Sequence, residues 1–433
     1  MDFKTACECA ERRLHAEWNE SAETMSAAVD LQKRAMIGYV KETRIIKEKI
    51  RTALAETAGP GEKTEFPSWY KDAPDAIFHE VWGLAGLAEW FTAAWGDSSS
   101  AKVIGDRVYF LKSGVMRLMP QRIERDRRDQ LIRALLLLAP GERQDKAFHE
   151  VYMLDGTRVT IFRSGIVKEG LDVIIFRRYI IPVYSFEEQA GRGTVPAEAI
   201  PLFESMVRLG VNVVFCGSVR SAKTTFLSTW QSYEDPALEG VMVETDPEIP
   251  MHHLMPSAPI VQLIADGDTL AGIAKNLMRS DADYFILAEA RDGIALDTAV
   301  RLAQRGTRRM KMTFHLRDPK MFAAEAATEI VRCMGGDIAK TELRVASSFD
   351  YVFHFVSLQG MGKKKLAGIY EVGVRDGSPY AEDICVYDAA KDKWRWTFRI
   401  DADRRRRFLS ADHTAFAVFE KELQNLEIRG RLS

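Results

Sequence analysis

The sequence predicts an α/β protein with a mostly parallel sheet in its C-terminal part, a smaller α+β domain before it and a helical module at the N-terminus. Residues 2–56 contain almost no Gly or Pro and place apolar residues at helical spacing. Residues 73–189 mix strand and helix patterns. After residue 200, apolar strands alternate with helices, which is the order that builds a parallel sheet.

Two segments predict the domain borders, because both combine Gly and Pro between more regular patterns. The first is "ETAGPGEKTEFPSW", which begins at Glu56, and the second is "AGRGTVPAEAI", which begins at Ala190. Composition therefore predicts a helical module (1–56), a linker (57–72), an α+β domain (73–189), a second linker (190–200) and a nucleotide-binding α/β domain (201–433).

The elements follow from local patterns. In the α+β domain, "AKVIGDRVYFLKSG" predicts a hairpin, "RRDQLIRALLLLA" a helix, and "LDGTRVTIF" and "LDVIIFRRYI" two further strands. In the α/β domain, the expected order is strand Val211–Cys216, a helix from Lys223, strands Val241–Glu244 and Ile260–Ile264, a helix ending near Arg279, strand Tyr284–Ala288, helix Ile294–Gln304, strand Met310–His315 and a helix from Pro319.

Composition limits the possible partners. Lys and Arg total 60 against 62 for Asp and Glu, so no overall charge attracts nucleic acid or anionic lipid. "DRRRRF" from Asp403 is expected to be a solvated run, or a local contact for anionic lipid or an acidic tail. The longest apolar run, "ALLLLA", is too short to span a bilayer, and the charged N-terminus predicts a cytoplasmic protein. Five scattered cysteines predict reduced thiols rather than disulfides or a metal site.

The segment from Gly217 to Thr224 is one residue away from a phosphate-binding loop, and it lies between an apolar strand and a helix. In such a loop, backbone N–H groups and the helix N-terminus face phosphates, while Lys223 reaches the β and γ oxygens and Thr224 ligates Mg²⁺. Ala222 stands where the loop normally has glycine. We expect it to weaken ATP binding without abolishing it. The alternative is an ordinary turn with an exposed lysine.

Other expected strands end in polar residues. "DYFILAEARDG" delivers Glu289, and "MVETDPEI" places Glu244 and Glu248 after another strand. "MKMTFHL" places Thr313 and His315 at the end of a third. Ligands of open α/β sheets bind beyond these strand ends, where carboxylates can hold a metal's water or orient an attacking water. Singly, each could be a capping acid or a structural histidine; together they favour a phosphoryl-transfer site.

The order of these motifs, with "GSVRSAKTT", "VETDPEI", "LMRSDADYFILAEARDGIALD" and "AQRGTRRMKMTFH", resembles the secretion ATPase superfamily. Its members are the motors of type II and type IV secretion, type IV pili and Tad pili. The similarity is closest to the Tad-pilus and conjugative branch, because "GDRVYFLKSG", "LDGTRVTIF" and "VIIFRRY" also match. The resemblance implies a RecA-like P-loop NTPase core that uses ATP and Mg²⁺. It also implies a cytoplasmic hexameric ring beneath an inner-membrane platform protein, with no direct nucleic-acid contact.

The resemblance also implies roles for individual residues. Glu248 would activate water, Glu289 would be the Walker B acid that holds the metal together with Thr224, and His315 and Arg291 would complete the catalytic set. Nucleotide would be bound by the loop and by arginines of the α+β domain: Gly217, Ser218, Val219, Arg220, Ser221, Ala222, Lys223, Thr224, Thr225, Arg177, Arg178 and Arg158. Arg279 matches a further arginine that flanks Walker B.

Several positions depart from the pattern of the superfamily. Ala222 and Ala288 replace glycines, Thr245 replaces an aspartate, Thr307 replaces a histidine, and Asp281 occupies a usually basic position. These departures leave a second hypothesis open, in which the chain is an attenuated homologue that serves as a structural or regulatory nucleotide-binding subunit. A DNA-handling ATPase is a third, disfavoured by the neutral net charge.

Overall fold

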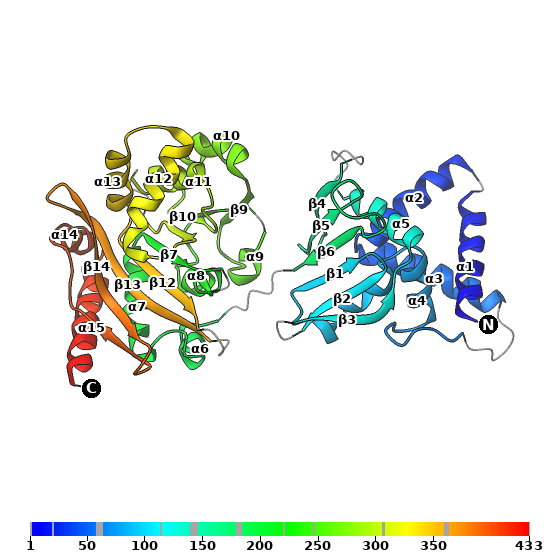
Figure 1. Cartoon of the computed structure of the whole chain (residues 1–433), viewed down its shortest axis with the longest axis horizontal. Coiled ribbons are helices and arrows are strands. Elements are labelled where there is room, and N and C mark those ends of the chain that lie inside the picture. Colours follow the sequence, from blue (N-terminus) through cyan, green and yellow to red (C-terminus); the bar gives the residue numbers. More distant parts are fainter. Residues whose placement is uncertain are drawn as a thin grey trace. The chain divides into compact units, whose positions relative to one another are not determined.

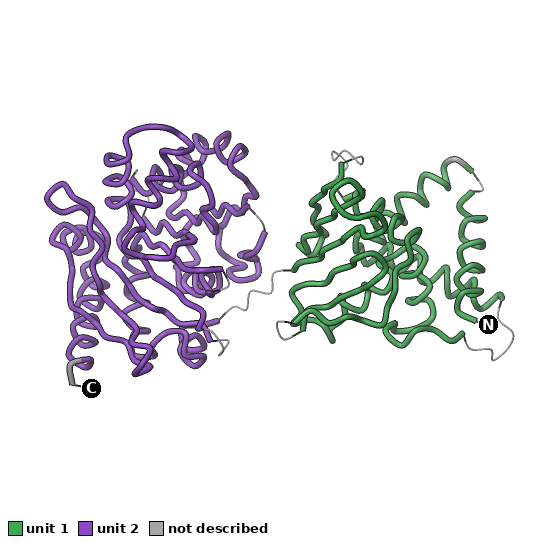
Figure 2. The backbone as a smooth tube through the Cα atoms, in the orientation of Figure 1, with its two compact units in different colours: residues 1–180 green, residues 181–433 purple. Residues whose placement is uncertain are grey.

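The chain forms two compact units, Met1–Ile180 and Ile181–Ser433 (Figure 2). The computed structural model describes residues 2–19, 21–57, 64–112, 115–138, 146–178, 184–219, 221–245, 247–304, 308–358 and 363–432. Among these residues, no helix combines the length and the apolar character needed to cross a membrane.

The first unit begins with the expected helices, α1 (Phe3–Trp18), α2 (Ala22–Met36) and α3 (Val40–Thr57), followed by α4 (Ala73–Val81) (Figure 1). Side-chain caps fix the starts of α1, α2 and α4, where Asp2, Ser21 and Asp72 accept the amides of Thr5, Thr24 and Asp75. Ile46 and Ile50 of α3 share an apolar cluster with Phe78 of α4. The helical module therefore lies in the same compact unit as the α+β part, and the linker expected at 57–72 does not separate two units.

The rest of this unit is a six-stranded antiparallel sheet in the order β3-β2-β1-β6-β5-β4. Alternate side chains of its central strands are buried, and Leu131, Ile132 and Leu135 of the expected helix α5 pack in the same cluster. The elements are η1 (Ala85–Phe91), η2 (Ala93–Trp95), β1 (Ser100–Ile104), β2 (Arg107–Lys112), β3 (Val115–Arg122), α5 (Arg125–Leu136), β4 (Phe148–Tyr152), β5 (Arg158–Phe162) and β6 (Val173–Arg177).

The second unit is built on a nine-stranded sheet in the order β15-β14-β13-β12-β7-β11-β10-β8-β9. The neighbouring strands β12, β7, β11, β10, β8 and β9 pair in parallel, as the alternating pattern predicts. Strands β13, β14 and β15 extend the sheet beyond β12 with antiparallel pairing. The strands are β7 (Val213–Gly217), β8 (Gly240–Glu244), β9 (Ile260–Ile264), β10 (Tyr284–Leu287), β11 (Lys311–Phe314), β12 (Tyr351–Ser357), β13 (Lys364–Arg375), β14 (Ser378–Asp388) and β15 (Lys393–Trp396).

Helices cover both faces of this sheet (Figure 1). Val213 and Phe215 of β7 join one apolar cluster, and the alternate residues Val214 and Cys216 join the other. The helices are α7 (Ile200–Leu209), α8 (Lys223–Ser232), α9 (Met251–Leu254), α10 (Gly267–Leu277), α11 (Gly293–Gln304), η4 (Pro319–Met321), α12 (Phe322–Met334), α13 (Ile338–Ser348), α14 (Ala402–Ala411) and α15 (His413–Leu432), with the short η3 (Ala197–Ala199) before α7. The α/β fold class is therefore confirmed.

The border between the units differs from the expected one. Helix α6 (Phe186–Gly191) begins in the expected α+β domain and ends inside the linker expected at 190–200, yet it belongs to the second unit. Phe186 is fully buried there, with its ring centroid 4.3 Å from that of Tyr233 and 5.8 Å from that of Phe226. Because the core contacts of α6 are with residues of the second unit, the border between the units lies before α6, between Ile180 and Ile181.

The arginine run in α14 is not simply a solvated patch. Arg404 is 4% exposed and its guanidinium lies 3.1 Å from Asp350 and 2.6 Å from Glu371, both of which are buried. Arg407 also pairs with Asp350 at 2.6 Å, whereas Arg406 is exposed. The expectation of a solvated run is wrong for Arg404, because this residue fastens α14 to the sheet.

Candidate active site at the carboxyl ends of the parallel strands

The candidate site begins where β7 ends and α8 starts. Gly217 has a φ of +141°, and a Cβ built on it would lie 2.0 Å from the carbonyl oxygen of Phe355, so no larger residue fits. Ala222 has a φ of 80° and a ψ of 17°, which is the left-handed conformation that glycine adopts easily. The alanine therefore keeps the backbone shape of a phosphate loop and carries the strain of a side chain in that shape.

The N-terminus of α8 can accept an anion. The N-cap residue, Ala222, has no side chain that can accept a hydrogen bond, so within the described part of the chain the first-turn N–H groups lack the usual side-chain cap. The hydroxyl of Ser221 is buried and has no hydrogen-bond partner in the described part of the chain. Ser218 and Val219 are exposed, Thr224 and Thr225 are half-buried, and Arg220 lies outside the described residues. Among the described residues, the loop thus offers the Ser221 hydroxyl and the first-turn N–H groups as donors beside a positive helix end.

Lys223 is buried rather than exposed. Its Nζ donates to the carbonyl oxygens of Gly217 (3.1 Å) and Ser218 (2.7 Å) and lies 3.4 Å from Nδ1 of His315. Burial lowers the pKa of Lys223 to about 8. Electrostatic interactions with Cys216, Glu289 and Glu248 raise this pKa, but they do not outweigh the effect of burial. The alternative interpretation expected an exposed lysine, and that part of it is wrong.

Glu289 and His315, which follow neighbouring strands β10 and β11, form a hydrogen-bonded group with this lysine. Nε2 of His315 lies 3.2 Å from Oε1 of Glu289, and Arg291 pairs with Oε2 of Glu289 at 2.5 Å. The side chain of Glu289 is 17% exposed, so most of it is shielded from solvent, and each of its two carboxylate oxygens has a partner. A continuous polar chain runs from Lys223 through His315 and Glu289 to Arg291.

Glu244 is the last residue of β8 and Glu248 lies in the segment that follows it, and the two acids have different roles. Glu244 is buried, and its Oε1 accepts the backbone amides of Glu248 (3.0 Å) and Ile249 (2.9 Å). It is therefore a positioning residue that fixes the segment after the strand. Glu248 is half-buried, and its charge raises the pKa of Lys223, so it lies within electrostatic reach of the loop.

The arginines of the α+β part lie in the first unit. Arg178 donates to the carbonyl oxygens of Ser98 (2.8 Å), Trp90 (3.1 Å) and Trp95, and its guanidinium lies 4.1 Å from the ring centroid of Trp90. Arg158 pairs with Glu150 and lies opposite the exposed Arg177 in the β5–β6 register. Arg178 thus has a role in holding its own unit together that its sequence position did not indicate.

Some other positions stand apart from the polar chain. Arg279 is exposed just after α10, and Thr307 lies outside the described residues. Sequence reasoning missed Phe355, whose carbonyl confines Gly217, because nothing in the sequence links that strand to the loop. It also missed the hydrogen bond from the Thr313 hydroxyl to the carbonyl of Ala288, which ties β11 to the segment before Glu289.

No family profile and no curated protein matches the sequence. Among solved structures, the VirB11 ATPase of the Brucella suis type IV secretion system in complex with sulphate is 15% identical, with a TM-score of 0.35 over 63% of this chain and 89% of that one. The Legionella pneumophila ATPase DotB is 14% identical, with a TM-score of 0.45 over 76% of this chain and 85% of its own. The pilus retraction motor PilT with bound ADP is 13% identical, with a TM-score of 0.47 over 78% and 86%.

Proposed function

We propose that the second unit binds and hydrolyses ATP and that the chain is a motor subunit of a pilus-assembly or type II/IV secretion system. The observation that carries the ATPase proposal is the polar chain from Lys223 to Arg291 beside the uncapped start of α8. A buried cation, a held carboxylate and free helix donors at one sheet edge are what phosphoryl transfer requires. The secretion role is supported by the motif resemblance alone.

The residues of the loop fit a polyphosphate. The phosphates would lie against Gly217, which has no side chain, and would accept hydrogen bonds from the Ser221 hydroxyl and the first-turn amides of α8. Lys223 would exchange its bonds to the loop carbonyls for bonds to phosphate oxygens. Thr224 and Glu289 would hold Mg²⁺, which supplies charge neutralisation for the phosphates when bound.

The catalytic roles are divided among the acids. Glu248 would orient the attacking water, since it stands within electrostatic reach of the loop on a segment fixed by Glu244. His315 connects Lys223 to Glu289, so it can transmit the position of the lysine to the acid. Arg291 would stabilise negative charge if it exchanged its contact with Glu289 for one with phosphate.

The proposed ring and its docking partners follow from the resemblance. A homohexamer beneath an inner-membrane platform protein is the assembly that the motifs imply, and the phosphate contacts of Arg158, Arg177 and Arg178 are proposed on the same basis. Of these three, Arg177 is exposed, whereas Arg178 would have to leave three carbonyl oxygens.

An attenuated regulatory or structural subunit remains the second candidate function, and the loop geometry favours it. The left-handed Ala222 strains the loop, and Lys223 is engaged by the loop's own carbonyl oxygens. Both features would lower the affinity for ATP. In this case the chain would bind nucleotide weakly and turn it over slowly.

ATP binding by calorimetry and Mg·ATP turnover, measured on the full chain, test the proposal. Lys223→Ala should abolish both, while Lys275→Ala, an exposed lysine of α10, should leave both unchanged. Binding without turnover in the natural protein would support the attenuated subunit. Equal turnover by Lys223→Ala and the natural protein would contradict the assigned site, and stimulation by DNA would favour a DNA-handling ATPase instead.

A further inference from the structure

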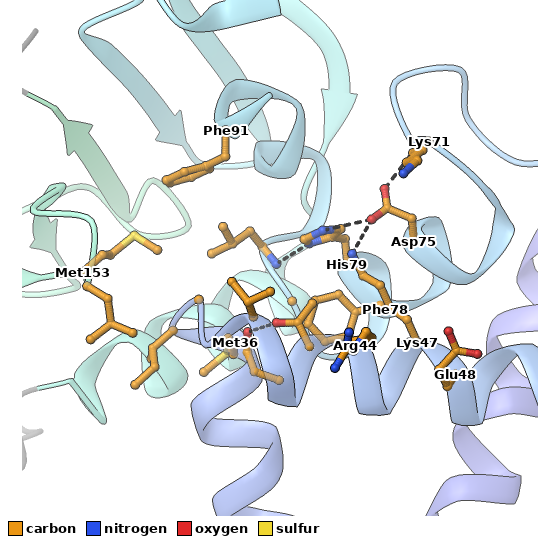
Figure 3. A pocket seen from close by; sticks show the side chains of 18 of the residues that line it. Met36, Arg44, Lys47, Glu48, Lys71, Asp75, Phe78, His79, Phe91 and Met153 are labelled. Atoms are coloured by element: carbon orange, nitrogen blue, oxygen red, sulfur yellow. Dashed lines mark hydrogen bonds and ion pairs between the residues drawn. The ribbon is translucent and has the colours of Figure 1, made fainter. Parts of the chain in front are cut away.

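The first unit contains a cavity of about 550 Å³ that shares no residue with the proposed nucleotide site. It lies where α3 and α4 meet η1 and the loop at residues 153–155 (Figure 3). Pockets that hold organic molecules have volumes of roughly 300–1,000 Å³. The cavity is therefore large enough for a small organic ligand.

Apolar core side chains form much of the cavity wall. Met36, Phe78, Leu84 and Met153 line it, and each of them is at most 8% exposed. The half-buried ring of Phe91 adds to this wall (Figure 3). Side chains that face a hollow lack van der Waals contacts on that side, and an apolar ligand would supply these contacts.

The charged side chains of the lining balance one another, since four are basic and four are acidic. Lys47 pairs with Asp75 at 2.5 Å, and Arg51 pairs with Glu48 at 2.5 Å. The remaining four carry two charges of each sign: Arg44, Lys71, Asp72 and Asp155. The cavity therefore has no net charge with which to select an anion or a cation.

The two acids without an ion pair are engaged by hydrogen bonds of the fold. The carboxylate of Asp72 accepts the amide of Asp75 at 2.8 Å. Asp155 accepts bonds from the amide and hydroxyl of Thr157 at 2.9 and 3.0 Å. Neither carboxylate needs a ligand as its partner.

The imidazole in the lining adds neither charge nor an open hydrogen-bond site. Burial lowers the pKa of His79 to about 4, so this ring is neutral at pH 7. Its Nδ1 already accepts the amide of Leu84 at 3.4 Å. Within the described part of the chain, no buried side-chain nitrogen or oxygen of the lining lacks a hydrogen-bond partner. A polar ligand would therefore lose hydration without meeting a buried group that needs it.

We propose that this cavity binds an uncharged apolar molecule, about the size of a medium-chain alcohol or a small aromatic compound. The ligand would lie against Phe78, Phe91 and Met153. Burial of its apolar surface would supply the binding free energy, whereas a charged group carried into the cavity would lose water and gain no unpaired partner. The proposal does not depend on ATP chemistry, which concerns the other unit.

Calorimetric titration of the full chain with butanol, hexanol and octanol tests the proposal. We expect one site per chain, with an affinity that rises about fourfold for each added methylene, because each methylene is buried on binding. Octanoate and octyltrimethylammonium, which have the same chain length and opposite charges, should bind no more tightly than octanol. Tighter binding of either ion, or affinities that do not rise with chain length, would overturn the proposal.

Two substitutions assign the binding to this cavity. Phe91→Ala should weaken octanol binding about tenfold, because the ligand loses a ring of the wall, whereas Phe66→Ala, outside the lining, should leave it unchanged. Leu154→Asp changes a side chain of the lining that is 55% exposed, so the fold should be preserved while a charge replaces apolar surface. Ile166→Asp is its matched control, because Ile166 is 56% exposed in another turn outside the lining.

Leu154→Asp should weaken octanol binding several-fold and leave the thermal unfolding of the chain unchanged, while Ile166→Asp should change neither. Equal octanol affinities of these two variants would place the binding elsewhere and overturn the proposal. Binding of the chain to phosphatidylcholine vesicles without any binding of monomeric octanol would assign the apolar surface to a membrane and would also overturn it.

Discussion

Replacing Ala222 with glycine tests the interpretation of the phosphate loop. A residue with a side chain pays about 1–2 kcal/mol for a left-handed backbone such as the φ of 80° found here. Glycine avoids this cost, but it loses about 0.5–1 kcal/mol more backbone entropy on folding. The free energy of unfolding of the second unit should therefore rise by about 0.5–1 kcal/mol.

Calorimetric unfolding of the full chain measures this change. A gain of that size should raise Tm by about 1–4 °C for a unit as long as Ile181–Ser433. Ala271→Gly is the matched control, because Ala271 is exposed in the interior of α10, where the same substitution should cost about 1 kcal/mol. The two substitutions should shift Tm in opposite directions.

The same substitution should tighten ATP binding, because removing the methyl group lets the backbone approach the phosphates. We expect a gain of about tenfold in affinity and a higher turnover at subsaturating ATP. A lower Tm for Ala222→Gly would show that the loop is not strained. An unchanged affinity for ATP would show that the loop has reshaped itself around alanine.

Three further predictions concern single residues. Glu289→Gln should keep ATP affinity within a few fold and lower steady-state turnover on the order of a hundredfold, because the carboxylate acts after binding; loss of binding with normal turnover per site would contradict its role. ATP should stabilise the ammonium of Lys223, so its pKa rises above about 8 on binding and the affinity measured by calorimetry should fall about tenfold between pH 7 and pH 9; Lys223→Arg should remove this pH dependence, and a natural protein without it would refute the argument. Arg404→Met should lower the free energy of unfolding measured in urea by about 3–5 kcal/mol, because it leaves buried carboxylates unpaired, whereas Arg406→Ala should change it little. Equal effects of the two substitutions would show that the buried ion pairs of Arg404 do not stabilise the fold.

The sequence by itself determined the elements and the identity of the polar strand ends. Strand and helix patterns depend on local periodicity, so the order from β7 to α12 could be predicted within a few residues, apart from the short helix α9. The placement of Glu289 and His315 beside Lys223 also followed, because parallel strands bring their carboxyl ends to one edge. The glycine-like requirement at Ala222 was visible from the motif and appears as its left-handed φ.

Only the tertiary structure decided how these residues are engaged. The Gly217 and Ser218 carbonyls hold Lys223, Glu244 fixes the segment that carries Glu248, and Trp90 and three carbonyls hold Arg178. Each of these contacts depends on atoms brought together by the fold, most of them backbone atoms, which no residue pattern reveals. The burial of Arg404 and the place of α6 in the second unit have the same origin, since packing against distant strands and rings outweighs the local composition that suggested a solvated run and a linker.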